Sequence, residues 1–400
     1  MTGDNTMDYL RRTWADIDLD CIVHNYRELK SRLTPGCRTM AVVKADAYGH
    51  GDGYVSRALQ QEGADWFAVS NINEAISLRR QKVARPILIL GCTPPEMAHT
   101  LAELGISQTV YSEEYAGELS RAAVEQKAVI DCHVKIDTGM SRIGFFAQHG
   151  HEARAAEEIA RVCALPGLSC TGVFTHFACA DECAGDSRDY TRMQYRSFLD
   201  TVELLEKRGI TFALRHCCNS AATLRYPEMH LDMVRPGIIL YGLSPAPWME
   251  GMLPLDPVME LKTTVSMIKD LPADTPVSYG RIYTTGEARR VATVPIGYAD
   301  GYPRVLSNRA DMLLAGRRVR VVGRVCMDQC MLDVTGLDVR ESMVATVFGR
   351  DGEAFLPVEE LADHMGTINY EVVCQISKRV PRLFVRDGQV VGQLNYIVSP

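Results

Sequence analysis

The sequence predicts an α/β protein: a (β/α)8 barrel of the TIM type over residues 14–253, followed by a mainly β domain over residues 256–400. Short β-rich runs alternate with amphipathic helical segments in the first part, and about eight such units in roughly 235 residues fit a barrel. A segment rich in Pro and Met, PAPWMEGMLPLDP at 245–257, then ends the alternation. Beyond it, β-rich runs follow one another with few helical segments between them. Periodicity alone leaves an open doubly wound sheet as the alternative for the first part.

Each expected strand of the first part is a short apolar run, and each expected helix carries apolar residues three or four positions apart. Strands and helices alternate in chain order as WADIDL (14–19), CIVHNYRELKSRL (21–33), TMAVVKA (39–45), GYVSRALQQEG (53–63), DWFAVS (65–70), NEAISLRRQ (73–81), PILIL (86–90), MAHTLAELG (97–105), QTVYS (108–112), AGELSRAAVEQK (116–127), DCHVKID (131–137), HEARAAEEIARVCAL (151–165), TGVFTHF (171–177), YRSFLDTVELLEKRG (195–209), LRHCCNS (214–220) and IILYGL (238–243).

The second part has one helical signal among β-rich runs, PVEELADHMG at 357–366. Its expected strands lie in TTVSMIKD (263–270), RRVATVPIGY (289–298), MLLAGRRVRVVGRV (312–325), CMLDVT (330–335) and MVATVFG (343–349).

Composition excludes several classes of protein. The net charge is −7, whereas a nucleic-acid surface usually needs a basic face. The first residues have no apolar signal core, and no run of about 18 apolar residues that could cross a membrane occurs. Thirteen cysteines, an odd number in a long chain, favour a reducing cytoplasm. Two CxxxC pairs lack the partner set of a zinc site, so we expect no metal.

Lys44 is the first candidate functional residue. It ends the apolar run AVVK and is followed by ADAYGHG. Catalytic groups of a barrel stand where its strands end, because the loops there vary around a rigid scaffold. A lysine held there can bind an aldehyde covalently if its pKa is lowered, although a lone strand-end lysine commonly just extends to solvent. Tyr48, four residues on, could hydrogen-bond a ligand.

Ten further segments, in order along nearly the whole chain, accompany KADAYGHG (44–51). They are TWADIDLDCIVHNYREL, LILGCTPPE, VKIDTGMSRIG, GVFTHFACAD, HCCNSAAT, VRPGIILYG, VSYGRIYTT, VPIGYADGYPR, GRVCMDQCMLDV and TINYEVVCQISKRVPR. Together these motifs resemble the alanine racemase family. The resemblance implies a barrel followed by a β domain, a pyridoxal phosphate cofactor, and a homodimer whose subunits share each active site. One departure is Lys378 in ISKRVPR, where the family usually has tyrosine.

The resemblance also implies the catalytic pair. Lys44 would carry pyridoxal phosphate and exchange a proton on one face of the substrate carbon. Tyr279, in VSYG, would do so on the opposite face, from the partner subunit. A tyrosine is a poor base at its ordinary pKa near 10, so the site must lower that pKa or relay the proton.

Arg235, in VRPG, matches the arginine that faces the pyridine nitrogen of the cofactor. An arginine does not donate its proton at working pH, so the pyridine nitrogen should stay unprotonated. An unprotonated ring withdraws electrons less strongly from the substrate carbanion, which favours prompt reprotonation of that carbon over transamination. By the same resemblance, His216 would hydrogen-bond Arg235 and His176 would pack on the cofactor ring.

Other positions would bind the cofactor phosphate and the substrate. The phosphate needs backbone N–H groups and hydroxyls at a helix start, where Ser220 reads as an N-cap. The residues implied for the cofactor are Tyr48, Asn219, Ser220, Gly237, Ile238 and Tyr370. For the substrate they are Arg142, Tyr298 and, from the partner subunit, Met327. Lys135, carbamylated in some family members, would support Arg142.

The implied function is racemisation of alanine by a two-base mechanism, supplying D-alanine for peptidoglycan. The alternative is a serine or broad-specificity racemase, because a small pocket discriminates only weakly against the extra hydroxyl that serine has relative to alanine. Serine-preferring relatives tend to replace the residue matched by Tyr370 with a smaller polar one, and this chain retains the tyrosine. A non-catalytic pyridoxal phosphate carrier would resemble the barrel half alone, and a barrel decarboxylase would pair the pyridine nitrogen with a carboxylate.

Overall fold

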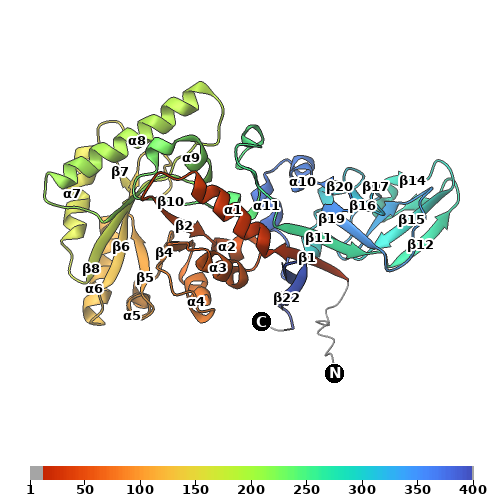
Figure 1. Ribbon diagram of the computed structural model, residues 1–400, viewed down its shortest axis with the longest axis horizontal. Coiled ribbons are helices and arrows are strands. Elements are labelled where there is room, and N and C mark those ends of the chain that lie inside the picture. The colour runs from red at the N-terminus through yellow and green to blue at the C-terminus, as the bar shows by residue number, and fades with distance from the viewer. Residues whose placement is uncertain (1–11, 399–400) are drawn as a thin grey trace. The chain divides into compact units, whose positions relative to one another are not determined.

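The computed structural model describes residues 12–398, and the chain divides into two compact units (Figure 1). The barrel unit consists of Ile22–Ala47 and Asp52–Asp256. The β unit consists of the chain from Pro257 onward, the chain up to Cys21, and the short segment Tyr48–Gly51. Within residues 12–398, no helix has both the length and the apolar character needed to cross a membrane.

The barrel unit is built on parallel strands in the hydrogen-bonded order β10-β2-β3-β4-β5-β6-β8-β9, with β7 (Phe145–Phe146) paired to β6. These strands are β2 (Arg38–Val42), β3 (Trp66–Val69), β4 (Ile87–Ile89), β5 (Ile106–Val110), β6 (Ile130–Asp137), β8 (Leu168–Phe174), β9 (Leu214–His216) and β10 (Met233–Val234). Asp232 N–H donates to Arg215 O (3.1 Å) and Arg235 N–H to Cys218 O (2.9 Å), so the segments of β9 and β10 are also joined. The sheet nearly closes, which confirms the predicted barrel.

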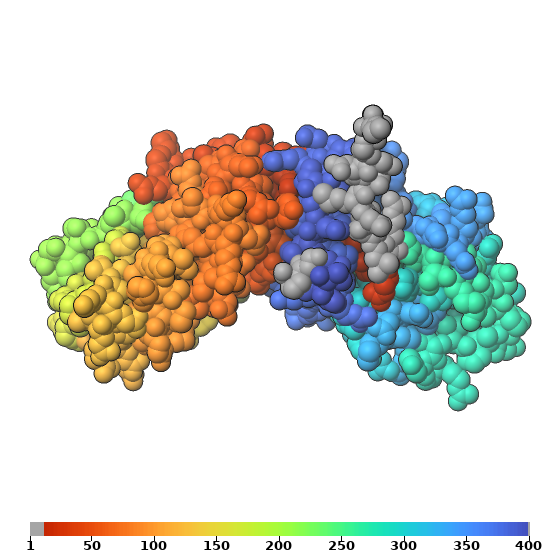
Figure 2. All heavy atoms as spheres, turned by 90° about the horizontal axis from the view of Figure 1, so that it is seen from below, coloured from red at the N-terminus to blue at the C-terminus, as the bar shows by residue number. Residues whose placement is uncertain are grey.

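Helices surround these strands (Figure 1). They are α3 (Asp52–Gln61), α4 (Ile72–Arg80), α5 (Ala98–Glu103), α6 (Glu113–Glu125), α7 (Glu152–Cys163), α8 (Gly185–Glu206) and α9 (Ser220–Arg225), while α1 (Leu19–Ser31) begins in the β unit and continues in the barrel unit. In α7 the buried Ala155, Ile159 and Val162 recur at helical spacing and face the core. The side chains of Asn71 and Ser112 cap α4 and α6. The orange and yellow surface of Figure 2 belongs to this first half of the barrel unit.

One expected strand of the barrel, residues 238–243, is wrong. Ile238–Tyr241 form a 3-10 turn, η3, and β10 just before it occupies the last barrel position. All four residues of the turn are fully buried. An apolar run that is buried on every side carries no periodicity, so its sequence cannot separate a strand from a helical turn.

The β unit contains a mixed sheet in the order β12-β15-β18-β17-β16-β19-β11-β1-β21-β22, with β20 paired to β19 and a separate pair, β13-β14. Its strands are β1 (Thr13–Asp18), β11 (Met259–Thr264), β12 (Met267–Leu271), β13 (Pro276–Val277), β14 (Tyr283–Thr284), β15 (Arg289–Val294), β16 (Asp311–Leu314), β17 (Arg317–Val322), β18 (Cys330–Asp333), β19 (Val344–Asp351), β20 (Ala354–Leu356), β21 (Arg382–Arg386) and β22 (Gln389–Leu394), and its helices are α10 (Val358–Met365) and α11 (Asn369–Cys374). The predicted mainly β second part is confirmed.

Strand β1 joins a different sheet from the one that the alternation suggested. The predicted barrel range began at residue 14, but β1 pairs antiparallel with β11 and parallel with β21 in the β unit. Trp14, Ala15 and Ile17 of this strand are buried there. A strand-then-helix pattern identifies the elements without saying which sheet the strand enters, and the barrel itself starts at β2.

Candidate active site

Lys44 lies two residues beyond β2, at the end of the barrel where the parallel strands finish. Just before it, Val42 N–H donates to Pro236 O and Val43 N–H to Ala68 O, both at 2.9 Å. The backbone is therefore bonded to both neighbouring segments up to the lysine. This rigid support fixes where the Lys44 side chain, which is partly buried, leaves the barrel.

The residues after Lys44 form a left-handed helical turn, α2 (Lys44–Tyr48). Ala45, Asp46 and Ala47 have φ values of 53–56°, and Tyr48 has 55°. This conformation costs a non-glycine residue about 1–2 kcal/mol, so other contacts must hold it. Two do so within the barrel unit: Ala45 N–H donates to Glu74 Oε1, and Asp46 Oδ1 accepts from Asp52 N–H, both at 2.9 Å.

Tyr48 and Tyr370, both expected at the phosphate, come together in the β unit. Their ring centroids are 6.1 Å apart. Burial raises the pKa of Tyr48 above its ordinary value, so its hydroxyl stays protonated and able to donate. Gly49 (φ +81°) passes so close to α11 that a Cβ would lie 2.4 Å from Val373 O, and its carbonyl accepts from Arg382 Nε at 2.9 Å. Only glycine allows this approach.

Arg235 is the centre of the barrel site. Its guanidinium is buried, and no carboxylate is among its hydrogen-bond partners in the described chain. Nη1 is 2.9 Å from His216 Nδ1, and Nη2 is 3.2 Å from His176 Nδ1. Nη2 also donates to Thr175 O (2.8 Å) and Cys217 O (3.1 Å). Burial lowers the pKa of Arg235 to about 10, which still leaves it charged at neutral pH.

The guanidinium determines the protonation of its neighbours. Since arginine only donates, the Nδ1 atom of His216 must accept, and its ring must be neutral. Burial and then the charge of Arg235 lower the pKa of both His216 and His176 well below the ordinary value. For His176, the charges of Lys135, Arg142 and Lys44 act in the same direction. The predicted residues Lys44, Arg142, His176, His216 and Arg235 therefore lie within electrostatic reach of one centre.

The prediction that Ser220 is an N-cap is wrong. The N-cap of α9 is Asn219, whose side chain accepts from Ala222 N–H at 2.9 Å, whereas Ser220 is the first helical residue. Two adjacent polar residues at a helix start are both good caps, so the sequence favours neither strongly. Ser220 Oγ accepts from Gly237 N–H at 2.8 Å, which brings the α9 start beside the Gly237–Ile238 segment.

Lys135 is a buried lysine whose Nζ has no hydrogen-bond partner in the described residues. Burial, and then the charges of Arg235 and Arg142, lower its pKa well below the ordinary value. An uncharged amine is the reactive form for carbamylation, and the resulting anion would relieve the excess of positive charge here. Asp137 orders the loop that carries Arg142 by accepting from Gly139 N–H (3.1 Å) and Ser141 N–H (2.9 Å).

Tyr279 lies in the β unit, and its side chain is 68% exposed in the single chain. It begins the 3-10 turn η5 (Tyr279–Arg281), directly after Ser278, whose φ is +66°. Ser278 Oγ donates to Arg324 O at 2.7 Å and so ties the turn to the segment ahead of β18. The catalytic tyrosine expected from the sequence is thus presented on an ordered turn with its ring toward solvent.

Tyr298 and Met327 lie on two loops of the β unit that are hydrogen-bonded together. Tyr298 N–H donates to Cys326 O (3.1 Å) and Ala299 N–H to Met327 O (3.0 Å). Gly297 allows this contact, because a Cβ there would lie 2.2 Å from Cys326 O. Both residues are exposed, Tyr298 by 44% and Met327 by 52%.

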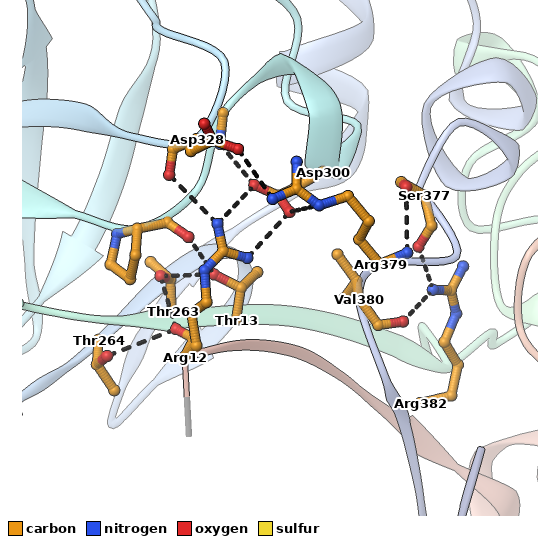
Figure 3. A network of polar contacts seen from close by, with 12 residues as sticks. Arg12, Thr13, Thr263, Thr264, Asp300, Asp328, Ser377, Arg379, Val380 and Arg382 are labelled. Atoms are coloured by element: carbon orange, nitrogen blue, oxygen red, sulfur yellow. Dashed lines mark hydrogen bonds and ion pairs between the residues drawn. The ribbon is translucent and has the colours of Figure 1, made fainter. Parts of the chain in front are cut away.

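Two arginines, Arg12 and Arg379, bind acidic residues of these two loops (Figure 3). The carboxylate of Asp300, which is fully buried, accepts from Arg12 Nη1 (3.0 Å) and Nη2 (3.2 Å) and from Gly297 N–H (3.0 Å). Arg379 Nε is 3.7 Å from the same carboxylate, and its Nη2 donates to Asp328 at 2.8 Å. We call Arg12, Arg379, Asp300 and Asp328 the loop clamp, because it joins the loops of Tyr298 and Met327.

Two residues described here, Arg12 and His133, were not among the residues predicted from the sequence. Arg12 belongs to a stretch that carries no recognisable motif, and its partner Asp300 is 288 residues away. His133 is buried beside His216. It is spaced two residues before Lys135, so its side chain projects from the same face of β6, which is the signal that could have found it.

Comparison with known proteins identifies the relatives of this chain. Two family models match it: alanine racemase, N-terminal domain, over residues 17–245, and alanine racemase, C-terminal domain, over residues 258–384. The alanine racemase of Clostridium tetani is 43% identical over 97% of this chain and 99% of its own length. That of Desulforamulus reducens is 45% identical over 93% of this chain and 98% of its own length. The crystal structure of alanine racemase from Bacillus anthracis with bound L-Ala-P matches with a TM-score of 0.91 and 37% identity, covering 98% of this chain and 99% of that one.

Acidification should destabilise the protein through its buried neutral histidines. Burial lowers the pKa of His133 to about 3 and that of His216 well below its ordinary value, whereas both titrate near pH ~6.5 in the unfolded chain. Stability from these rings is complete above about pH 6.5 and is lost as the pH falls below it, by up to about 1.4 kcal/mol per pH unit for each ring. Calorimetric unfolding at several pH values between about 7.5 and 5.5 measures this, and a midpoint that does not fall would contradict neutral rings.

Arg12→Ala should loosen the loops of Tyr298 and Met327. The substitution leaves the buried Asp300 carboxylate with Arg379 as its remaining cation, and unpaired buried charges are strongly destabilising. We expect the amides of Tyr298 and Ala299 to exchange hydrogen at least about 10-fold faster. The matched control is Arg27→Ala, which breaks an exposed pair with Glu62. Unchanged exchange at both amides in Arg12→Ala would show that the clamp does not order the loops.

Proposed function

This chain belongs to the alanine racemase family, and we propose that it interconverts L-alanine and D-alanine with pyridoxal phosphate as its cofactor. The observation that carries the proposal is the buried Arg235 between two neutral histidines, close to Lys44. A cation that cannot give up its proton suits a cofactor whose ring nitrogen stays unprotonated. The relatives named alanine racemase, one of them with bound L-Ala-P, support the same substrate.

The donors in the barrel unit fit pyridoxal phosphate. Lys44 would hold the cofactor covalently through its amine, and Arg235 would face the ring nitrogen. Asn219, Ser220, Gly237 and Ile238 supply hydroxyl and backbone donors at a helix start. Tyr48 and Tyr370, which lie together in the β unit, are separately proposed as cofactor-binding hydroxyls. When bound, the cofactor delocalises the negative charge that develops at the substrate α-carbon. No acidic side chain hydrogen-bonds Arg235 in the described chain, which argues against the decarboxylase alternative.

Racemisation requires a proton to leave one face of the α-carbon and another to arrive on the opposite face. We assign the first exchange to Lys44 Nζ and the second to Tyr279 Oη. Arg142 would bind the substrate carboxylate, supported by Lys135 in its carbamylated form, with Met327 N–H as a second donor and Tyr298 at the entrance. Both proton transfers at the α-carbon then use a side chain of the protein, one on each face, as a two-base mechanism requires.

We further propose a homodimer in which Tyr279, Tyr298 and Met327 complete the site of the partner subunit. All three side chains are 44% or more exposed in the single chain, so each is free to meet a second copy. Their turns are nonetheless ordered by hydrogen bonds, as a shared site requires. The presence of a complete β unit with these residues disfavours a non-catalytic pyridoxal phosphate carrier.

Retention of Tyr370 supports alanine over serine as the preferred substrate. The product D-alanine would serve peptidoglycan synthesis. In the described chain all thirteen cysteines are free thiols, which supports action in the reducing cytoplasm.

A racemisation assay tests the function directly. The purified protein, loaded with pyridoxal phosphate, is offered L-alanine and L-serine separately, and the D-products are measured by chiral chromatography. Abundant D-alanine with little D-serine supports the proposal. Equal or greater D-serine would replace it with a serine or broad-specificity racemase, and no D-product from either substrate would overturn it.

Tyr279→Phe should reduce racemisation by about 100-fold or more, because one of the two proton-transfer groups is lost. Cofactor binding, measured by absorbance, should survive, since Lys44 is untouched. The matched control is Tyr283→Phe on β14, four residues away in the same unit. Full activity of Tyr279→Phe would contradict the two-base assignment.

Lys44→Ala should lose the covalent link between the protein and the cofactor. Mass spectrometry after borohydride reduction should find no cofactor adduct in this variant, and an adduct on another lysine would contradict the assignment of Lys44.

A further inference from the structure

A second buried histidine stands behind the arginine–histidine pair of the site. His133, on β6, is 0% exposed, and its Nδ1 is 2.9 Å from His216 Nε2. His216 in turn has its Nδ1 2.9 Å from Arg235 Nη1. Arg235, His216 and His133 therefore form one hydrogen-bonded chain inside the barrel. The proposed function assigns roles to the first two residues and none to the third.

The direction of every hydrogen bond in this chain is determined by its first member. Arginine has only donors, so His216 Nδ1 accepts, and the single proton of the neutral His216 ring must be on Nε2. That Nε2–H then donates to His133, whose Nδ1 must accept. His133 is consequently neutral too, with its proton on Nε2. A proton added to either ring would place two N–H groups face to face.

The packing around the two rings also has little freedom. The His216 ring stacks on Phe174 with centroids 4.8 Å apart and an interplanar angle of 4°, and the His133 ring packs on Trp66 at 5.2 Å. Gly172 on β8 makes room for His133, because a Cβ there would lie 2.5 Å from both Nδ1 and Cε1 of the ring. The glycine and the tryptophan thus hold His133 where its Nδ1 meets His216.

We propose that His133 is a positioning residue, which holds His216 as the Nε2–H tautomer and thereby keeps Arg235 aimed at the cofactor ring nitrogen. The inference rests on the proposed function for the role of Arg235. Without an acceptor at position 133, the buried Nε2–H of His216 has no partner, and the tautomer with the proton on Nδ1 becomes competitive. That tautomer turns a donor toward Arg235, which loses one of its hydrogen bonds and its fixed orientation.

The tautomers can be measured without any assay of activity. Nitrogen-15 NMR of the cofactor-loaded protein, labelled at histidine, distinguishes protonated from unprotonated ring nitrogens. We expect Nδ1 unprotonated and Nε2 protonated in both His133 and His216, with His133→Gln and His216→Gln spectra giving the assignments. A proton on Nδ1 of either ring in the wild-type protein would overturn the proposal. Because this measurement does not depend on turnover, it stands even if the racemisation assay fails.

Two variants separate positioning from simple loss of packing. His133→Leu removes the acceptor, whereas His133→Gln keeps an amide oxygen that can accept from His216. We expect His133→Leu to lower kcat by about 10- to 100-fold with a smaller change in KM, and His133→Gln to recover most of that loss. The matched control is Val134→Ala, on the same strand but on its opposite face. Equal loss in all three variants would mean that His133 only fills space.

A side reaction gives a readout that a packing defect should not change. In abortive transamination, alanine gives its amino group to the cofactor, so that alanine and pyridoxal phosphate become pyruvate and pyridoxamine phosphate. Arg235 held in place disfavours this outcome, so His133→Leu should raise the pyruvate formed per D-alanine at least about 10-fold. Gly172→Ala changes none of the three hydrogen-bonded residues, but its Cβ would displace the His133 ring. This variant should raise the same ratio. An unchanged ratio in both variants would overturn the proposal.

Discussion

Burial of the Arg235 guanidinium in the barrel without a carboxylate is the constraint on which the site depends. An isolated buried charge is costly, and a paired carboxylate would ordinarily reduce that cost. Here carbonyl oxygens and two imidazole nitrogens accept its hydrogen bonds instead. Burial and then the charge of Arg235 lower the pKa of His176 and His216, and burial and then the charges of Arg235 and Arg142 lower the pKa of Lys135. Burial and one permanent charge thereby act together to keep the groups around Arg235 neutral.

The two units order their candidate residues by different means. In the barrel unit, parallel strands deliver Lys44 and Arg235 from neighbouring segments, and a left-handed turn redirects the chain directly after the lysine. In the β unit, Tyr279 and Tyr298 stand on short turns whose backbones are tied to adjacent loops. Arg235 has no carboxylate partner, whereas the fully buried carboxylate of Asp300 in the β unit is paired with Arg12 and lies near Arg379. The barrel unit therefore orders the basic groups Lys44 and Arg235, and the β unit orders the hydroxyl groups of Tyr279 and Tyr298.

Local patterns in the sequence predicted the barrel, the β domain and most element positions, because alternating strands and helices have strong periodicity. They failed where the deciding contact is distant. The partner strands of β1 are more than 240 residues away, and Arg12 meets Asp300 across a similar separation. The fully buried run Ile238–Tyr241 has no periodicity to read. His133 received no prediction, since the role proposed for it depends on a hydrogen bond that only the folded barrel creates. The roles of the site residues remain predictions.

The position of β1 has a consequence for how the protein is made. This strand lies between β11 and β21, so one side of the β-unit sheet combines segments that are far apart in the sequence. During synthesis β1 leaves the ribosome well before both of its partner strands, so it stays unpaired until β11, more than 240 residues later, has emerged. Loop closure over such a distance is slow, and exposed strand edges invite association with other chains. The barrel strands pair with one another within residues 38–234, whereas the β-unit sheet needs β21, up to Arg386, before β1 has both of its neighbours.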